Sequence, residues 1–186
     1  DGDPGVRPIA HIFVGSKAPW YEICDAALQF DTLPPGYALP PLDDRPPLDP
    51  ETGEIRGSCL CGGISFALAG PPQRVWNCHC QRCRKARAAV HACNAFFPAD
   101  AIRFTRGEAL RVSYKVEDAR FFQQHFCRVC GSKVPRPDPE RKIVVVPMGS
   151  LDDDPGMRPQ RHIFVASKAP WEEIADALPQ HAEYPA

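Results

Sequence analysis

The chain has 186 residues, of which 44% are hydrophobic and 24% charged, and its formal net charge is −1 at pH 7. This length and composition are sufficient for one globular domain with a hydrophobic core. Because the net charge is close to zero and no apolar run approaches the ~20 residues that cross a bilayer, we predict a protein that binds neither nucleic acid nor membrane.

The start of the chain, Asp1-Gly2-Asp3-Pro4, has neither an initiator Met nor the apolar core of a signal peptide, so we expect the numbering to begin inside a longer gene product. Residues 1–34 match residues 152–185 without a gap at an offset of 151, and 21 of the 34 positions are identical. The cysteine-rich middle of the chain occurs once. The repeat therefore predicts a complete domain at 57–186 and, at 1–34, the tail of a preceding unit whose body is absent. A short terminal duplication is the simpler alternative.

Residues 35–56 join these two parts and are rich in proline and acidic residues. That composition cannot form a helix and predicts an extended, semi-rigid connector. The N-terminal copy keeps apolar residues that have to be buried, among them Ile12, Phe13 and Trp20. We expect one of two outcomes: the copy packs on another face of its own domain, or it replaces the tail of a neighbouring chain in a swapped homodimer.

Short strands dominate the pattern from Gly57 onward. Alternating or β-branched segments predict strands near 64–68, 92–97, 102–104, 110–114, 120–126, 143–146 and 162–165. Helices are expected at 82–90 and at 171–178, the second between Pro170 and Pro179. The predicted fold class is therefore mainly β, with few and short helices.

Four cysteines stand in two close pairs, Cys59 with Cys61 and Cys127 with Cys130. Glycine follows the second cysteine of each pair and permits the tight turn of a zinc knuckle. Four thiolates fill the tetrahedral shell of a structural zinc. The pairing therefore predicts a closed zinc site rather than a set of buried free thiols.

Three more cysteines, Cys78, Cys80 and Cys83, fall within six residues and are called the claw below. Thiolates suit zinc, and three of them leave one tetrahedral position open, as in a catalytic site. The claw therefore predicts a second zinc that activates a thiol or polarises a carbonyl. The alternative is a second structural zinc with a fourth protein ligand, for which Cys93 is the first choice and the others are His79, His91 and His125.

The nine cysteines could also form a secreted disulfide framework. The odd count and the tight spacings favour metal, which predicts a reducing, cytoplasmic compartment. Arg84 and Lys85 belong to a basic run beside the claw. This run is either a solvated face or a clamp for a substrate carboxylate. His162 is either a structural histidine or a substrate-binding one.

At this point the sequence resembles a known family. The motifs are Gly57-Ser58-Cys59-Leu60-Cys61-Gly62, the claw with Arg84 and Lys85, Cys127 to Ser132, and the stretch from Gly149 to Trp171. They are similar to those of the GFA family, the glutathione-dependent formaldehyde-activating enzymes. The resemblance implies an Mss4-like, mainly β fold with two zinc ions. The structural zinc would lie on Cys59, Cys61, Cys127 and Cys130, and the catalytic zinc on Cys78, Cys80 and Cys83.

The resemblance also implies an activity. It is that of a carbon–sulfur lyase, which joins glutathione and formaldehyde to S-hydroxymethylglutathione or reverses that reaction. The leading hypothesis is thus a zinc-dependent lyase whose partner is a small thiol such as glutathione. The alternative is a non-catalytic zinc module that binds a protein partner. An open coordination position in a pocket would separate the two.

Overall fold

The computed structural model describes residues 2–37 and 53–185. The extended connector expected at 35–56 falls mostly outside these residues. The described strands and the α-helix are β1 (Ala10–His11), β2 (Leu28–Gln29), β3 (Ile55–Ser58), β4 (Ser65–Leu68), β5 (Arg74–Cys78), α1 (Gln81–Arg87), β6 (Ala92–Pro98), β7 (Ile102–Arg106), β8 (Arg111–Lys115), β9 (Gln123–Cys127), β10 (Arg136–Asp138), β11 (Ile143–Pro147) and β12 (His162–Ile163). Short 3-10 helices lie at Val14–Ser16, Ala99–Ala101, Glu108–Leu110, Met148–Ser150 and Val165–Ser167.

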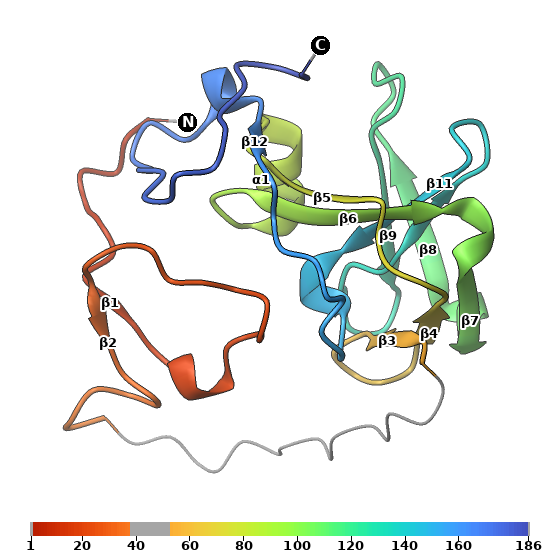
Figure 1. The fold of residues 1–186 in the computed structure, drawn as a ribbon, viewed down its shortest axis with the longest axis horizontal. Helices are drawn as coiled ribbons and strands as arrows, with labels where there is room; N and C mark the ends of the chain where they lie inside the picture. Colours follow the sequence, from red (N-terminus) through yellow and green to blue (C-terminus); the bar gives the residue numbers. More distant parts are fainter. Residues whose placement is uncertain (1, 38–52, 186) are drawn as a thin grey trace.

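Small sheets make up most of the domain (Figure 1). The largest has the strand order β10-β11-β6-β5-β12, a second has the order β3-β4-β7, and β8 pairs with β9. All of these pairs are antiparallel except that of β12 with β5, which is parallel. The predicted fold class, mainly β with short antiparallel sheets and few short helices, is confirmed.

The core forms where the apolar faces of the sheets meet. The continuous β-branched run at Ile143–Pro147 is a central strand, because it lies between β10 and β6 and its Val144 and Val146 are fully buried. Phe66 and Phe97 pack into the same core. The tail of the chain, residues 152–185, reaches this framework through β12 and the parallel pairing of His162 with Asn77.

Gly57 on β3 has no room for a side chain. A Cβ at this position would collide with the ring of Phe66 and the carbonyl oxygen of Ser150. We expect Gly57→Ala to lower the free energy of unfolding by about 1–3 kcal/mol, the usual cost of overpacking. Gly149→Ala is the control, because no atom lies within 4 Å of its added Cβ. Urea unfolding of both variants measures the difference, and equal stabilities would contradict the prediction.

One secondary-structure prediction is wrong. No helix forms at 171–178, where the chain is irregular apart from a turn at Trp171 and a bend at Asp176. The Lys168 ammonium donates to the Glu172 carbonyl at 2.6 Å, and the Leu178 amide donates to the Asp176 carboxylate at 2.9 Å. Side chains thus take the backbone groups that a helix would pair, which favours turns over helix. The helix expected at 82–90 is confirmed as α1.

The described part of the N-terminal copy, residues 2–34, adopts the same local structure as the tail. Phe13 and Phe164 have nearly identical left-handed conformations, with φ of 57° and 58°, and each starts a 3-10 turn. His11 bonds to Asp25 at 2.9 Å, as His162 does to Asp176. The repeat is therefore structural and not only a likeness of sequence.

The two copies differ in what they pack against. In the tail, β12 pairs with β5 and forms the edge strand of the largest sheet. In the N-terminal copy, β1 is paired only with β2 among the described residues. Consequently Ile163 is 2% exposed, but the equivalent Ile12 is 49% exposed. The copy instead places Trp20 in the core of the domain, at 8% exposure. It lies beside the tail in Figure 1.

Candidate metal centres

The four-thiol cluster, Cys59, Cys61, Cys127 and Cys130, comes together in space from two distant hairpins. Their sulfur atoms all lie within 4.8 Å of one another. The sulfur atoms of Cys59 and Cys61 are 3.5 Å apart, and those of Cys61 and Cys127 are 3.9 Å apart. Four sulfurs bound at 2.3 Å to one tetrahedral zinc would be about 3.8 Å apart. The cluster therefore fits a zinc ion.

The turns around these sulfurs resemble each other. The Gly62 amide donates to the Cys59 carbonyl at 2.8 Å, and the Gly131 amide donates to the Cys127 carbonyl at 2.9 Å. Both glycines have positive φ values, which a side chain would strain. The Ile64 amide also donates to the Cys59 sulfur at 3.2 Å. Each pair of cysteines is thus held in a tight turn that aims backbone donors at sulfur.

The claw lies where β5 ends and α1 begins. Cys78 is the last residue of β5, Cys80 caps the N-terminus of α1, and Cys83 lies in its first turn. The three sulfurs lie within 4.8 Å of one another. Cys93, His79, His91 and His125, the predicted completing ligands, are not part of this group. The claw therefore brings together three ligands, as predicted, and they fit a metal with one position left for another ligand.

Electrostatics in the claw also favour a cation. Hydrogen bonds from Cys78 and Cys83 lower the pKa of the Cys80 thiol, and the Cys83 amide donates to the same sulfur at 3.4 Å. The same bonds raise the pKa of Cys78 and of Cys83. Three neighbouring thiols cannot all ionise without a compensating positive charge. A bound divalent metal supplies that charge.

The predicted substrate-binding residues occupy different environments. The Arg84 guanidinium donates to the His79 carbonyl and to the Ser167 carbonyl, each at 3.2 Å, so it joins the claw to the tail. Lys85 is exposed on α1. His162 is 2% exposed, and both of its ring nitrogens are hydrogen-bonded. Arg84 and His162 thus stabilise the structure around the claw, and Lys85 is the one of the three that solvent reaches readily.

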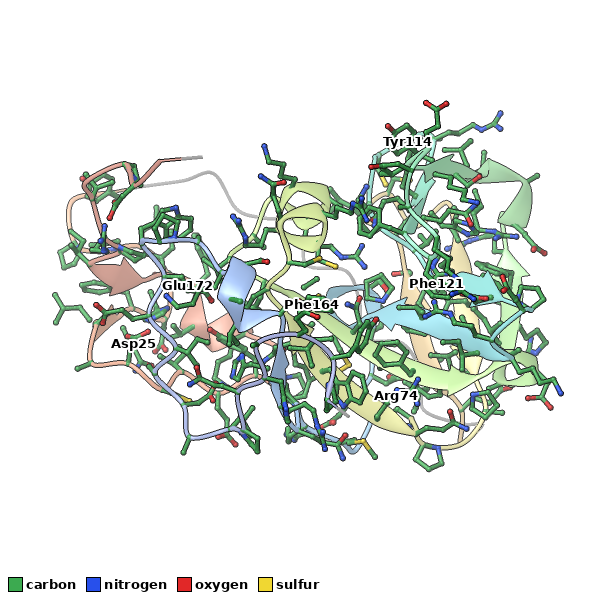
Figure 2. The ribbon with its side chains drawn as sticks, turned by 90° about the horizontal axis from the view of Figure 1, so that it is seen from above. Asp25, Arg74, Tyr114, Phe121, Phe164 and Glu172 are labelled. Carbon is green, nitrogen blue, oxygen red and sulfur yellow. The ribbon has the colours of Figure 1, made fainter. Side chains whose placement is uncertain are left out.

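A third cluster of possible ligands consists of His79, His91 and Glu172. The sequence offers His79 and His91 only as alternative fourth ligands of the claw metal, and it does not point to Glu172 or to its neighbour in the network, Asp176. The repeat holds a signal for Glu172, because the equivalent residue of the N-terminal copy is Tyr21. Figure 2 shows Glu172 at the end of the molecule that carries Asp25, away from Tyr114 on β8.

Two surface cavities lie apart from these centres. One, of about 460 Å³, is lined by residues of β3, β4 and β7, among them Arg56, Arg103 and Arg106. The other, of about 210 Å³, lies near Phe121 and Asp138. Neither is lined by a claw residue. Among residues 2–37 and 53–185, no helix has both the length and the apolar character needed to cross a membrane.

The chain is similar to several known proteins. A crystal structure of a Rhodobacter sphaeroides protein aligns with a TM-score of 0.43 and 24% identity, covering 56% of this chain and 98% of that one. A Halomonas elongata protein named "Putative glutathione-dependent formaldehyde-activating enzyme" is 31% identical over 126 residues, covering 64% of this chain and 80% of that protein. The family described as "Glutathione-dependent formaldehyde-activating enzyme" matches residues 54–167, more than half of the chain. The chain therefore belongs to the GFA family, the glutathione-dependent formaldehyde-activating enzymes.

Proposed function

We propose that the chain is a zinc-dependent carbon–sulfur lyase that acts on a thiol–aldehyde adduct of the S-hydroxymethylglutathione type. The observation that carries the proposal is the claw, a group of three thiols separate from the complete four-thiol cluster. A structural role needs one closed site, and the four-thiol cluster provides it. The second, three-ligand group is the kind of site that accepts a substrate ligand.

In the proposed reaction the thiol sulfur bonds to the aldehyde carbon, and the aldehyde oxygen takes up the proton that the thiol loses. The reverse reaction breaks the same carbon–sulfur bond. Zinc, when bound by Cys78, Cys80 and Cys83, lowers the pKa of a thiol that coordinates to it. Arg84 keeps the claw in place through the carbonyls of His79 and Ser167. The two cysteine centres are proposed to hold two zinc ions per chain, one on the claw and the other on the four-thiol cluster.

Thiolate ligands require reduced cysteines, so the proposed location is a reducing compartment such as the cytoplasm. The described cysteines form no disulfides, which supports this proposal.

A non-catalytic zinc module that binds a protein partner is the second candidate. One observation favours it: the N-terminal copy leaves the edge of β1 without a partner strand among the described residues and exposes Ile9 and Ile12. Such edges can accept a strand from another chain. A protein with no activity toward any thiol and aldehyde would favour this candidate.

The test is an assay of the zinc-loaded protein with formaldehyde and either glutathione or the neutral thiol 2-mercaptoethanol. We expect adduct formation with glutathione above the spontaneous rate. Because Lys85 is exposed beside the claw, Lys85→Ala should raise KM for glutathione up to about fivefold and leave kcat unchanged, since an exposed ion pair contributes up to about 1 kcal/mol. KM for the neutral thiol should not change.

Lys115→Ala is the matched control, because Lys115 is exposed on β8 and belongs to neither thiol group. A similar rise in KM for both thiols in Lys85→Ala would indicate altered packing instead of charge recognition. A rate with glutathione equal to the spontaneous rate would contradict the proposed function itself.

A further inference from the structure

Glu172 is a buried carboxylate with an unusual set of partners. Its side chain is 7% exposed, and its carboxylate oxygens face two histidines. Oε2 lies 3.1 Å from Nδ1 of His79, and Oε1 lies 3.4 Å from Nδ1 of His91. Burial alone would raise the pKa of Glu172, but its interactions with His79 and His91 lower it to about 2. A buried, ionised carboxylate needs a positive charge beside it.

The hydrogen bonds behind His79 determine which of its nitrogens can donate. Nε2 of His162 lies 2.9 Å and 3.0 Å from the two oxygens of Asp176, so this nitrogen carries a proton. Nδ1 of His162 then accepts from Nε2 of His79, at 2.7 Å. Nδ1 of His79 faces the carboxylate of Glu172 at 3.1 Å. A cation joins these two atoms: either a proton on the ring, or a metal ion that both atoms bind.

The distances between the three side chains are compatible with a bound metal ion. A proton could join His79 to Glu172 at 3.1 Å, but 3.4 Å between His91 and Glu172 exceeds the usual range of an N–H···O bond. Two ligands of one tetrahedral ion with bonds of 2.0–2.2 Å lie about 3.3–3.6 Å apart, a range that includes the contact of His91 with Glu172 and is slightly longer than that of His79 with Glu172. One ion bound by the carboxylate and by both imidazole nitrogens would satisfy all three side chains.

Comparing the tail with the N-terminal copy shows which contacts of this network belong to the shared tail structure and which occur only in the tail. It retains a histidine and an aspartate in the same contact, His11 with Asp25 at 2.9 Å, so that pair belongs to the tail structure itself. At the position of Glu172, however, the copy has Tyr21. The carboxylate is thus present in the copy that packs against His79 and His91, and is absent from the copy that does not.

We propose that His79, His91 and Glu172 form a third metal site, which binds a divalent transition-metal ion such as zinc through two imidazole nitrogens and one carboxylate. Imidazole with carboxylate is a common ligand set for these ions. His162 and Asp176 orient the ring of His79 from behind, as the outer partners of metal-bound histidines do. The side chain of His91 is 23% exposed, which gives an ion a path to the site.

Such an ion would join three parts of the chain. Glu172 lies in the tail, His91 immediately precedes β6, and His79 lies between two claw cysteines. The site would therefore hold the tail on the domain and fix the backbone of the claw at His79. This inference does not depend on the proposed lyase activity.

The first test is metal content, measured by mass spectrometry on protein purified in the presence of zinc. We expect three zinc ions per chain in the wild type and two in Glu172→Gln and in His91→Asn. Glu172→Tyr should also bind two, and this variant carries the residue that the N-terminal copy accommodates in the same fold. Glu173→Gln, which changes an exposed neighbouring carboxylate, should still bind three.

The second test needs no variant. Zinc-soaked crystals of the wild type should show an anomalous difference peak between the three side chains, about 2.0–2.2 Å from each ligand atom. Two zinc ions per wild-type chain, or no peak at this position, would overturn the third site and leave both cysteine centres as they are. Three ions in Glu172→Gln would overturn it as well. The lyase assay is unaffected by these results, so the two proposals fail separately.

Discussion

Cys127→Ser is expected to prevent folding of the domain. Cys127 is fully buried at the end of β9, and it packs with Ile64 and Val134 in the second core cluster. A structural zinc contributes about 10 kcal/mol or more to folding, which is as large as the whole stability of a typical domain. Losing one of four thiolates should therefore leave little soluble protein, with no near-UV circular dichroism and less than one zinc per chain. Cys24→Ser, at an exposed thiol outside both groups, is the control and should resemble the wild type.

Cys80→Ser should behave differently, because its thiol belongs to the claw. Serine is a good residue at the N-terminus of a helix, and its hydroxyl can accept from the Cys83 amide in place of the sulfur. We expect a folded protein that has lost the claw metal and whose lyase activity is close to the spontaneous rate. If Cys80→Ser and Cys127→Ser were equally unfolded, or equally folded, the division into a structural and a catalytic centre would be wrong.

Both thiol groups could be predicted from the sequence, because metal ligands form a local pattern. A close pair of cysteines followed by glycine favours a tight turn, and this turn directs both sulfur atoms toward the same point. The strands were predictable for a similar reason: a run such as Ile143–Pro147 has one plausible environment, a strand buried on both faces. These features depend on neighbouring residues in the sequence, so they can be predicted before the fold is known.

The features that were missed depend on contacts between distant residues. The helix expected at 171–178 does not form, because Lys168 and Asp176 make side-chain hydrogen bonds to backbone groups of this segment. The flanking prolines, on which the prediction was based, give no indication of these bonds. Glu172 lies 93 positions from His79 in the chain, and the tail reaches the claw through the pairing of β12 with β5 and the bond from Arg84 to Ser167. The spacing of residues along the chain gives no indication that the tail contacts the claw. A substitution between the two copies, Tyr21 against Glu172, is the one trace of it in the sequence.

The N-terminal copy raises the question of whether it contributes to stability or is a passive remnant. Its local structure repeats that of the tail, but the equivalent tryptophans of the two copies are buried to different extents. Trp20 is buried in the main core, packed with residues such as Met148, whereas Trp171 is only partly buried. The Arg158 guanidinium also donates to the Pro19 carbonyl at 3.5 Å. These contacts indicate that the domain has incorporated the copy into its own core.

Trp20→Ala is therefore expected to destabilise the whole domain, although the substitution lies outside the family match at 54–167. Removing a buried tryptophan typically costs about 3–5 kcal/mol, because the lost burial is added to the cavity that remains. Tyr37→Ala is the matched control, since Tyr37 is an aromatic residue of the same N-terminal part but is 72% exposed, and its loss should cost under about 0.5 kcal/mol. Urea unfolding at equal zinc content measures both values. Equal stabilities of the two variants would show that the copy is docked too weakly to stabilise the domain, and that the duplicated tail is a passive remnant.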